Sequence, residues 1–117
     1  MKKRCRTQQG SKAVLSTRDE LLAKLTSEPV RRVCVDHGVK ELAVFGSLVG
    51  EHFSDQSDVD LLIEFLPEAR MDLFEFCGLG NRFSELLGRK VDLVPKKGLK
   101  PLIRESVLAS ARIIYAA

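Results

Sequence analysis

The chain has 117 residues, of which 44% are hydrophobic and 30% charged, and its formal net charge is +3. This length suits one domain with one core, and the composition is that of a globular chain rather than a disordered one. No apolar run approaches the roughly 20 residues that span a bilayer, so no membrane-spanning helix is predicted. The chain opens with a basic run that no apolar stretch follows. We therefore expect a flexible basic tail over residues 1–15 rather than a secretory signal, and one domain over residues 16–117.

The cysteines indicate a reducing compartment. Cys5, Cys34 and Cys77 are odd in number and widely spaced, and no C-x-x-C pair is present. Neither a disulfide framework nor a zinc ribbon is therefore indicated, and we expect a cytoplasmic protein. Cys34 and His37 form a C-x-x-H pair, but Cys34 lies on an apolar helix face and is interpreted as a core residue. The few aromatic residues do not alternate with basic ones, so direct nucleic-acid binding is not predicted.

Two helices are predicted at the start of the domain. Thr17 and Glu20 have the spacing of a capping box, and leucines follow at helical intervals. A second helix is expected to begin around Ser27-Glu28-Pro29, since proline is tolerated in the first turn, and to stop at Gly38.

The rest of the chain alternates strands with helices. Four short apolar runs predict β-strands at residues 41–45, 59–65, 90–94 and 112–115. An apolar stripe predicts a helix over residues 71–87 that stops at Gly88, and Pro101 marks the start of a last helix. This order predicts an α/β (α+β) fold with a mixed sheet of about four strands and helices packed on it. Because residues 46–58 are marginal for a parallel crossover, the first two strands are expected to be antiparallel.

Two aspartates open the second strand. Asp58 and Asp60 lie two residues apart, so strand alternation points both carboxylates the same way. The like charges repel each other, and a divalent cation such as Mg²⁺, which prefers oxygen ligands, would remove that cost. Gly46 and Ser47 end the preceding strand, where a glycine lets the backbone approach an anion and a short helix would present N–H groups to phosphates. The alternative for Ser47 is a plain N-cap at a strand-to-turn junction.

Asp92 is the third acidic candidate. It interrupts the apolar run Val91-Asp92-Leu93-Val94, which we expect to be a buried strand, and a buried charged group needs a partner. If its strand lies beside that of Asp58 and Asp60, three carboxylates converge and can hold two metal ions roughly 3.5–4 Å apart. The alternative is a salt bridge from Asp92 to Arg89 or Lys90.

Together these residues resemble the DNA-polymerase-beta-like nucleotidyltransferase superfamily, in particular its minimal (MNT) members. The family pattern is Gly-Ser, ten residues, D-x-D and a later strand aspartate, which Gly46, Ser47, Asp58, Asp60 and Asp92 match. The segments VKELAVFGS, SDVDLLIEF, LLGRKVDLV and LKPLIRESVL are also similar to the family, so that the resemblance covers about residues 18–116. It implies a nucleotidyltransferase fold, catalytic and metal-binding roles for the three aspartates, and phosphate binding by the Gly-Ser pair.

The resemblance also implies Mg²⁺, with two ions, and ATP or another nucleoside triphosphate as substrate. In relatives paired with HEPN-domain toxins it implies transfer of AMP to the toxin, which silences it. Leu48, Val49 and Gly50 stand where such proteins often carry arginine. A non-catalytic module that neutralises a partner by contact alone is therefore the alternative function. The small size indicates that the acceptor comes from another protein or another copy of the chain. Leu48, Val49 and Phe53 are expected either to contact that acceptor or to pack inside, and His52 is expected to be a solvated loop residue.

Overall fold

A computed structural model describes residues 13–49 and 58–117. Residues 1–12 of the predicted basic tail lie outside the described residues, and so do His52 and Phe53. The elements follow in the order α1 (Ala13–Leu25), α2 (Glu28–Asp36), β1 (Val39–Phe45), the 3₁₀ helix η2 (Gly46–Leu48), β2 (Val59–Phe65), α3 (Leu73–Leu87), β3 (Val91–Pro95), the 3₁₀ helix η3 (Lys96–Gly98), α4 (Pro101–Ser110) and β4 (Arg112–Ala116).

The sheet is mixed, as predicted. Its strand order is β3-β2-β1-β4, with β1 antiparallel to both β2 and β4 and with β2 parallel to β3. The antiparallel β1–β2 pair agrees with the shortness of the segment that joins the two strands. The parallel β2–β3 pair is joined through α3, which supplies the crossover that parallel strands require.

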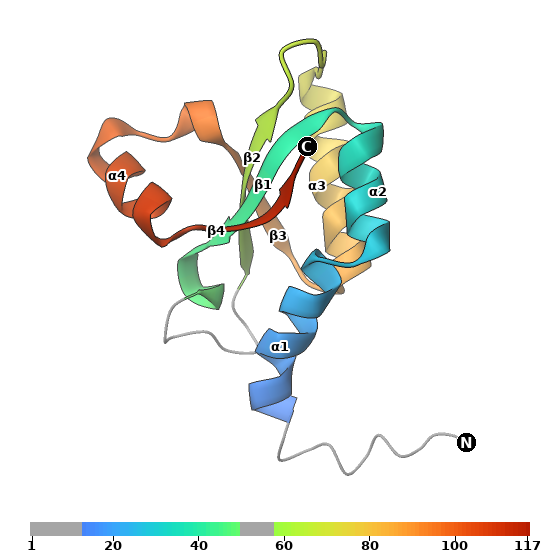
Figure 1. The fold of residues 1–117 in the computed structure, drawn as a ribbon, viewed down its shortest axis with the longest axis vertical. Helices are drawn as coiled ribbons and strands as arrows, with labels where there is room; N and C mark the ends of the chain where they lie inside the picture. The colour runs from blue at the N-terminus through green and yellow to red at the C-terminus, as the bar shows by residue number, and fades with distance from the viewer. Residues whose placement is uncertain (1–12, 50–57) are drawn as a thin grey trace.

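The core lies between one face of the sheet and three helices. In Figure 1, α1, α2 and α3 stand together on one side of the sheet, whereas α4 stands on the other side. Alternate residues of β2, namely Val59, Leu61 and Ile63, belong to the large core cluster that these three helices complete. Leu62 points to the other face, where it forms a smaller buried cluster with Ala43 and Leu99. The sheet therefore has one closed face and one sparsely covered face.

Most helix limits have local causes, but the predicted start of α1 was wrong. Thr17 and Glu20 lie inside α1, which begins at Ala13, because a capping box forms only where the residue before the helix leaves helical geometry. Asp72 and Glu75 instead make a capping box at α3, in which the Glu75 N–H donates to Asp72 Oδ1 at 2.8 Å. Gly88 ends α3 in the left-handed conformation with φ 70°, as predicted.

The buried cysteine is a core residue, as predicted. Cys34 is fully buried in the large cluster, and burial raises the pKa of its thiol to about 12. The neighbouring His37 places Nδ1 2.9 Å from the Val33 carbonyl oxygen of its own helix. Within the described part of the chain, no helix is long and apolar enough to cross a membrane.

Candidate functional site

Gly46 brings the end of β1 directly against Asp60. Its φ of 75° is left-handed, which favours glycine. The register pairs Phe45 with Asp60, so the turn at Gly46 begins beside that carboxylate. A Cβ at position 46 would lie 3.0 Å from Asp60 Cγ and closer still to Oδ2. The backbone at Gly46 therefore lies closer to Asp60 than it could if residue 46 had a side chain.

The parallel pairing of β2 with β3 places Asp60 beside Asp92. The two residues are direct partners in the register, and Asp58 immediately precedes β2. Both strand aspartates alternate with residues of the large core cluster, such as Leu61 and Leu93, so they belong to the sparsely covered face. The structure therefore confirms that the strands of the three aspartates are neighbours.

The surroundings of Asp60 disfavour its charge. Burial raises the pKa of Asp60 above its ordinary value of 3.8, and the negative charges of Asp92 and Asp58 raise it further. Asp58 is exposed and lies 3.9 Å from the Lys90 ammonium, also exposed, so this ion pair is screened by water. Three acidic groups thus act on one another at the edge of the open face.

The expectation that Asp92 is buried was wrong. Asp92 is exposed, because β3 is an edge strand and the side of the strand that carries Asp92 has no helix of the main core over it. The argument that a buried charge requires a partner therefore does not apply to this residue. Its position beside Asp60, rather than burial, is what connects it to the site.

The three carboxylates do not form a preassembled metal cage. Among residues 13–49 and 58–117, no group of three or more His, Cys, Asp or Glu side chains is arranged to hold a metal ion. The donor chemistry nevertheless suits a divalent cation, since carboxylate oxygens are the ligands that Mg²⁺ prefers. A cation would also remove the repulsion that opposes ionisation of Asp60.

The turn after Gly46 is packed inward. Gly46 begins the short helix η2, and the Val49 N–H donates to the Gly46 carbonyl oxygen at 3.2 Å. Leu48 is 1% exposed and Val49 packs against the large core cluster, so these two residues are part of the interior rather than a contact surface. Ser47 is the middle residue of η2 and directly follows Gly46.

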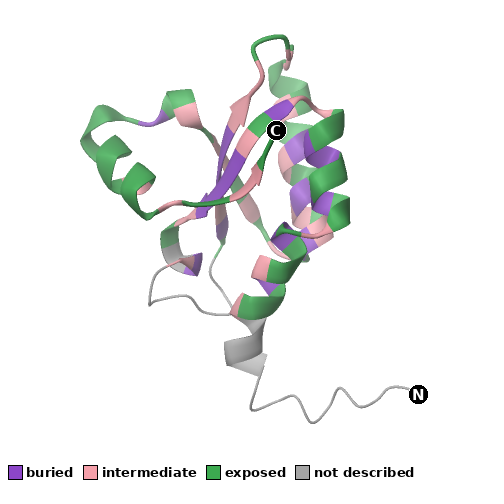
Figure 2. Cartoon of the chain, in the orientation of Figure 1, coloured by how far each residue is buried: buried purple, intermediate pink, exposed green. Residues whose placement is uncertain are grey.

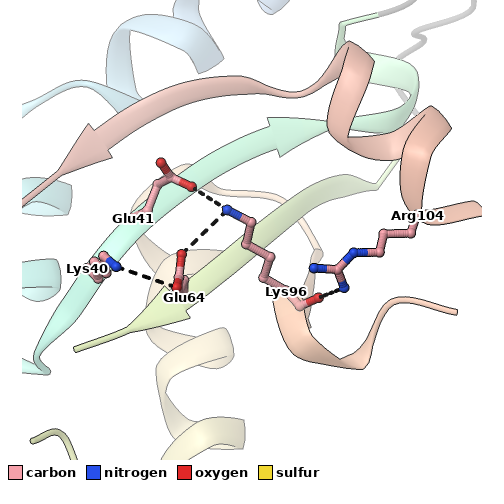
Figure 3. A network of polar contacts seen from close by, with 5 residues as sticks. All are labelled: Lys40, Glu41, Glu64, Lys96 and Arg104. Atoms are coloured by element: carbon pink, nitrogen blue, oxygen red, sulfur yellow. Dashed lines mark hydrogen bonds and ion pairs between the residues drawn. The ribbon is translucent and has the colours of Figure 1, made fainter. Parts of the chain in front are cut away.

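A second group of charges on the same sheet face was not predicted. Lys96 Nζ lies 3.2 Å from Glu41 Oε1 and 3.5 Å from Glu64 Oε1, and Lys40 Nζ lies 3.8 Å from Glu64 Oε2. Figure 3 shows Lys96 reaching from η3 to the glutamates of β1 and β2. The sequence carries a signal for the glutamates, since Glu41 and Glu64 keep the alternation of the open face, but the lysine comes from a distant segment. This network attaches η3, and with it the segment leading to α4, to the sheet.

Comparison with known proteins defines the family. Residues 27–114 match the family described as the nucleotidyltransferase domain. The chain belongs to this nucleotidyltransferase family. It is 38% identical over 95 residues to the protein adenylyltransferase MntA of Thermococcus cleftensis, covering 74% of this chain and 94% of that protein. A Methanocaldococcus jannaschii protein named for the same activity, MJ0128, is 41% identical over 70 residues, which are 59% of this chain and 69% of that protein.

Solved nucleotidyltransferase structures share the fold. A minimal nucleotidyltransferase structure is 32% identical, with a TM-score of 0.58 over 83% of this chain and 88% of that one. A toxin-antitoxin structure with AMP-PNP is 16% identical, with a TM-score of 0.63 over 76% and 72% of the two chains. A tri-AMPylated Shewanella oneidensis HEPN toxin in complex with MNT antitoxin gives 15% identity and a TM-score of 0.59 over 86% and 73%. The mixed sheet and its helices are thus those of the nucleotidyltransferase fold.

Proposed function

We propose that this nucleotidyltransferase transfers AMP from ATP to a hydroxyl group of a HEPN-domain toxin and thereby acts as its antitoxin. The single observation that carries the proposal is that Asp60 and Asp92 are neighbours in the parallel register. Asp58 lies two residues before Asp60 in the chain, and Gly46 lies against Asp60. The names of the relatives support the activity, and the toxin-antitoxin complexes among structures of this fold support the partner. The free thiols of Cys34 and Cys77 fit a cytoplasmic location.

Each site residue has a role that follows from its position. Asp58 and Asp60 would hold Mg²⁺ together with the bound nucleotide rather than as a preformed cage, and Asp92 would complete the ligand set. Bound there, the metal would supply charge neutralisation for the triphosphate. Gly46 and Ser47 would contact the β- and γ-phosphates, because Gly46 is exposed beside Asp60 and a glycine lets an anion come close to the backbone.

The chain's own groups would also handle the reaction's proton. The acceptor oxygen forms a bond to the α-phosphorus, the bond to the β-phosphate oxygen breaks, and pyrophosphate leaves. The proton of the attacking hydroxyl passes to a base, and Asp92 is the exposed strand carboxylate at the site. Asp92 is therefore our choice for the group that receives that proton.

Neutralisation by contact alone is the second candidate function. The observation that favours it is the turn after Gly46, where buried Leu48 and packed Val49 supply no cation to a triphosphate. In this case the aspartates would be dispensable for silencing the toxin, which separates the two candidates experimentally.

The test is transfer of label from α-³²P-labelled ATP, in the presence of Mg²⁺, to the product of the gene next to that of this chain, which we expect to be the HEPN-domain toxin. We expect wild-type protein to label the toxin, Asp60→Asn to abolish labelling, and Asp36→Asn to leave it unchanged. Asp36 is a matched control because it is an exposed aspartate at the end of α2, in the helical layer on the other side of the sheet. Absence of labelling by wild-type protein would refute catalysis. If Asp60→Asn still silences the toxin, contact alone carries the function.

A further inference from the structure

Helix α4 leaves much of its apolar surface in water. Leu102 is 96% exposed, Ile103 50% and Leu108 37%, and no residue of α4 is buried. Of the helix itself, Val107 packs against the small cluster of Ala43, Leu62 and Leu99. Figure 2 shows α4 as a mostly exposed element beside the sheet, in contrast to the purple faces of the helices on the other side. The helix is thus attached to the domain along a narrow contact.

The same segment is strongly basic. Residues 96–112 contain five lysine or arginine residues and one glutamate, a net charge of +4, although the whole chain has only +3. Lys97, Lys100, Arg104 and Arg112 are all exposed. We call the exposed residues Leu102, Ile103 and Leu108, together with these four basic residues, the α4 surface. It combines apolar side chains with positive charge, which favours a protein whose docking face is apolar and acidic.

The α4 surface lies on the same side of the sheet as the strand aspartates. Phe45, the register partner of Asp60, packs against the small cluster that α4 joins. Other exposed apolar residues, such as Leu73 and Phe74, belong to α3 in the opposite layer. A protein bound to α4 would therefore approach Asp60 and Asp92, whereas one bound to the start of α3 would be separated from them by the sheet.

We propose that the α4 surface is the docking site for the protein that accepts the nucleotidyl group, through an apolar and acidic patch on that protein. The proposal rests on the proposed function for the identity of the acceptor. A second copy of this chain is a poor occupant, because the two α4 surfaces would bring like charges together.

The experiment measures binding and transfer separately, with the full chain and the product of the adjacent gene, the expected HEPN-domain toxin. Titration calorimetry compares wild type with Leu102→Glu and with the double variant Lys97→Glu/Lys100→Glu. Leu73→Glu is the matched control, because it places the same charge at a similarly exposed leucine in the other layer. We expect Leu102→Glu to weaken binding about 10-fold or more, as is typical for central apolar contacts, and Leu73→Glu to have no effect. In transfer assays, the α4 variants should raise the KM for the acceptor and leave kcat unchanged.

The outcomes separate the docking site from the catalytic proposal. Loss of binding with Leu102→Glu supports docking even where wild-type protein transfers no AMP, since binding is read directly. Wild-type affinity in both α4 variants, or absence of binding by wild-type protein, would overturn the proposal. A wild-type dimer in light scattering that Leu102→Glu dissociates would also overturn it, because the occupant would then be a second copy. Leu102 is almost fully exposed, so its substitution should not impair folding.

Discussion

Replacing Gly46 with alanine tests the contact between the first strand and Asp60. Gly46 and Gly88 have nearly the same left-handed backbone, with φ of 75° and 70°. Their surroundings differ, because a Cβ at position 46 would lie 3.0 Å from Asp60 Cγ, whereas nothing lies within 4 Å of a Cβ at position 88. Gly88→Ala is therefore a control that carries the conformational cost alone.

The expected costs follow from these two environments. A side chain in the left-handed conformation costs about 1–2 kcal/mol, which should be the whole effect of Gly88→Ala. The crowding at Asp60 should add about 1–3 kcal/mol to Gly46→Ala, as is usual where an extra methyl group displaces its neighbours. Shortening the neighbour by Asp60→Ala should remove most of this second cost, so Gly46→Ala should cost about 1–2 kcal/mol in that background.

Urea denaturation measures these free energies for wild type, Gly46→Ala, Gly88→Ala, Asp60→Ala and the double variant Gly46→Ala/Asp60→Ala. AMP transfer measures the functional effect. A displaced Asp60 carboxylate should reduce transfer about 100-fold or more in Gly46→Ala, since small misplacements of a catalytic group have effects of this size. Gly88→Ala should retain activity. The reasoning is refuted if Gly46→Ala loses no more stability than Gly88→Ala, or if it keeps wild-type transfer.

Three further predictions concern charge and helix stability. The folded state raises the pKa of Asp60, so the folded chain keeps this proton to a higher pH than the unfolded chain does. Asp60 therefore lowers the stability of the fold as the pH rises from 3.8, the ordinary pKa of this group, through the folded pKa. In EDTA, the stability of Asp60→Asn should therefore increase relative to that of wild type over this rise in pH. Melting curves measured between pH 4 and pH 7 test this, and a constant difference in melting temperature between the two proteins would contradict it. Gly78→Ala should stabilise the fold by about 0.5–1 kcal/mol without changing transfer, because nothing lies within 4 Å of the added Cβ; an unchanged urea midpoint would count against this. Lys96→Met should cost about 1–2 kcal/mol at pH 7, because it leaves Glu41 and Glu64 without their shared cation. Bonding to Glu41 raises the pKa of Lys96, so this difference should persist below 10.5 and close as the pH rises through the folded pKa.

Local sequence patterns were sufficient for most of the fold. The predicted limits of β2, residues 59–65, are the observed ones, because the apolar run lies between Asp58 and the Leu66-Pro67 pair. Gly88 ended α3 as predicted, since its left-handed conformation is a local property. The start of α1 was missed because Thr17 and Glu20 have the spacing of a cap in the interior of a helix as well, and spacing alone does not reveal where the helix begins.

The site required information about strand order that local patterns lack. The spacing of Asp58 and Asp60 is visible in the sequence, but the register partner of Asp60 is set by the pairing of β2 with β3. The sequence led to the correct neighbour for a partly wrong reason, because Asp92 was expected to be buried and is exposed on an edge strand. Whether a strand lies at the edge or in the centre of a sheet depends on how the strands that follow it pair. Here β4 pairs with β1, which leaves β3 at the edge.

The last helix shows the same limit in packing. Leu102, Ile103, Val107 and Leu108 predicted a helix, and α4 forms, but among these four Val107 is the one that packs on the sheet cluster. Burying one leucine side chain contributes about 1.5–3 kcal/mol, a substantial fraction of the 5–15 kcal/mol that stabilises a typical domain. The isolated domain forgoes this stabilisation at α4, on the side of the sheet that carries Asp60 and Asp92. An acceptor protein that covers Leu102 and Ile103 would gain it on binding, so docking and access to the aspartates would be favoured by the same contact.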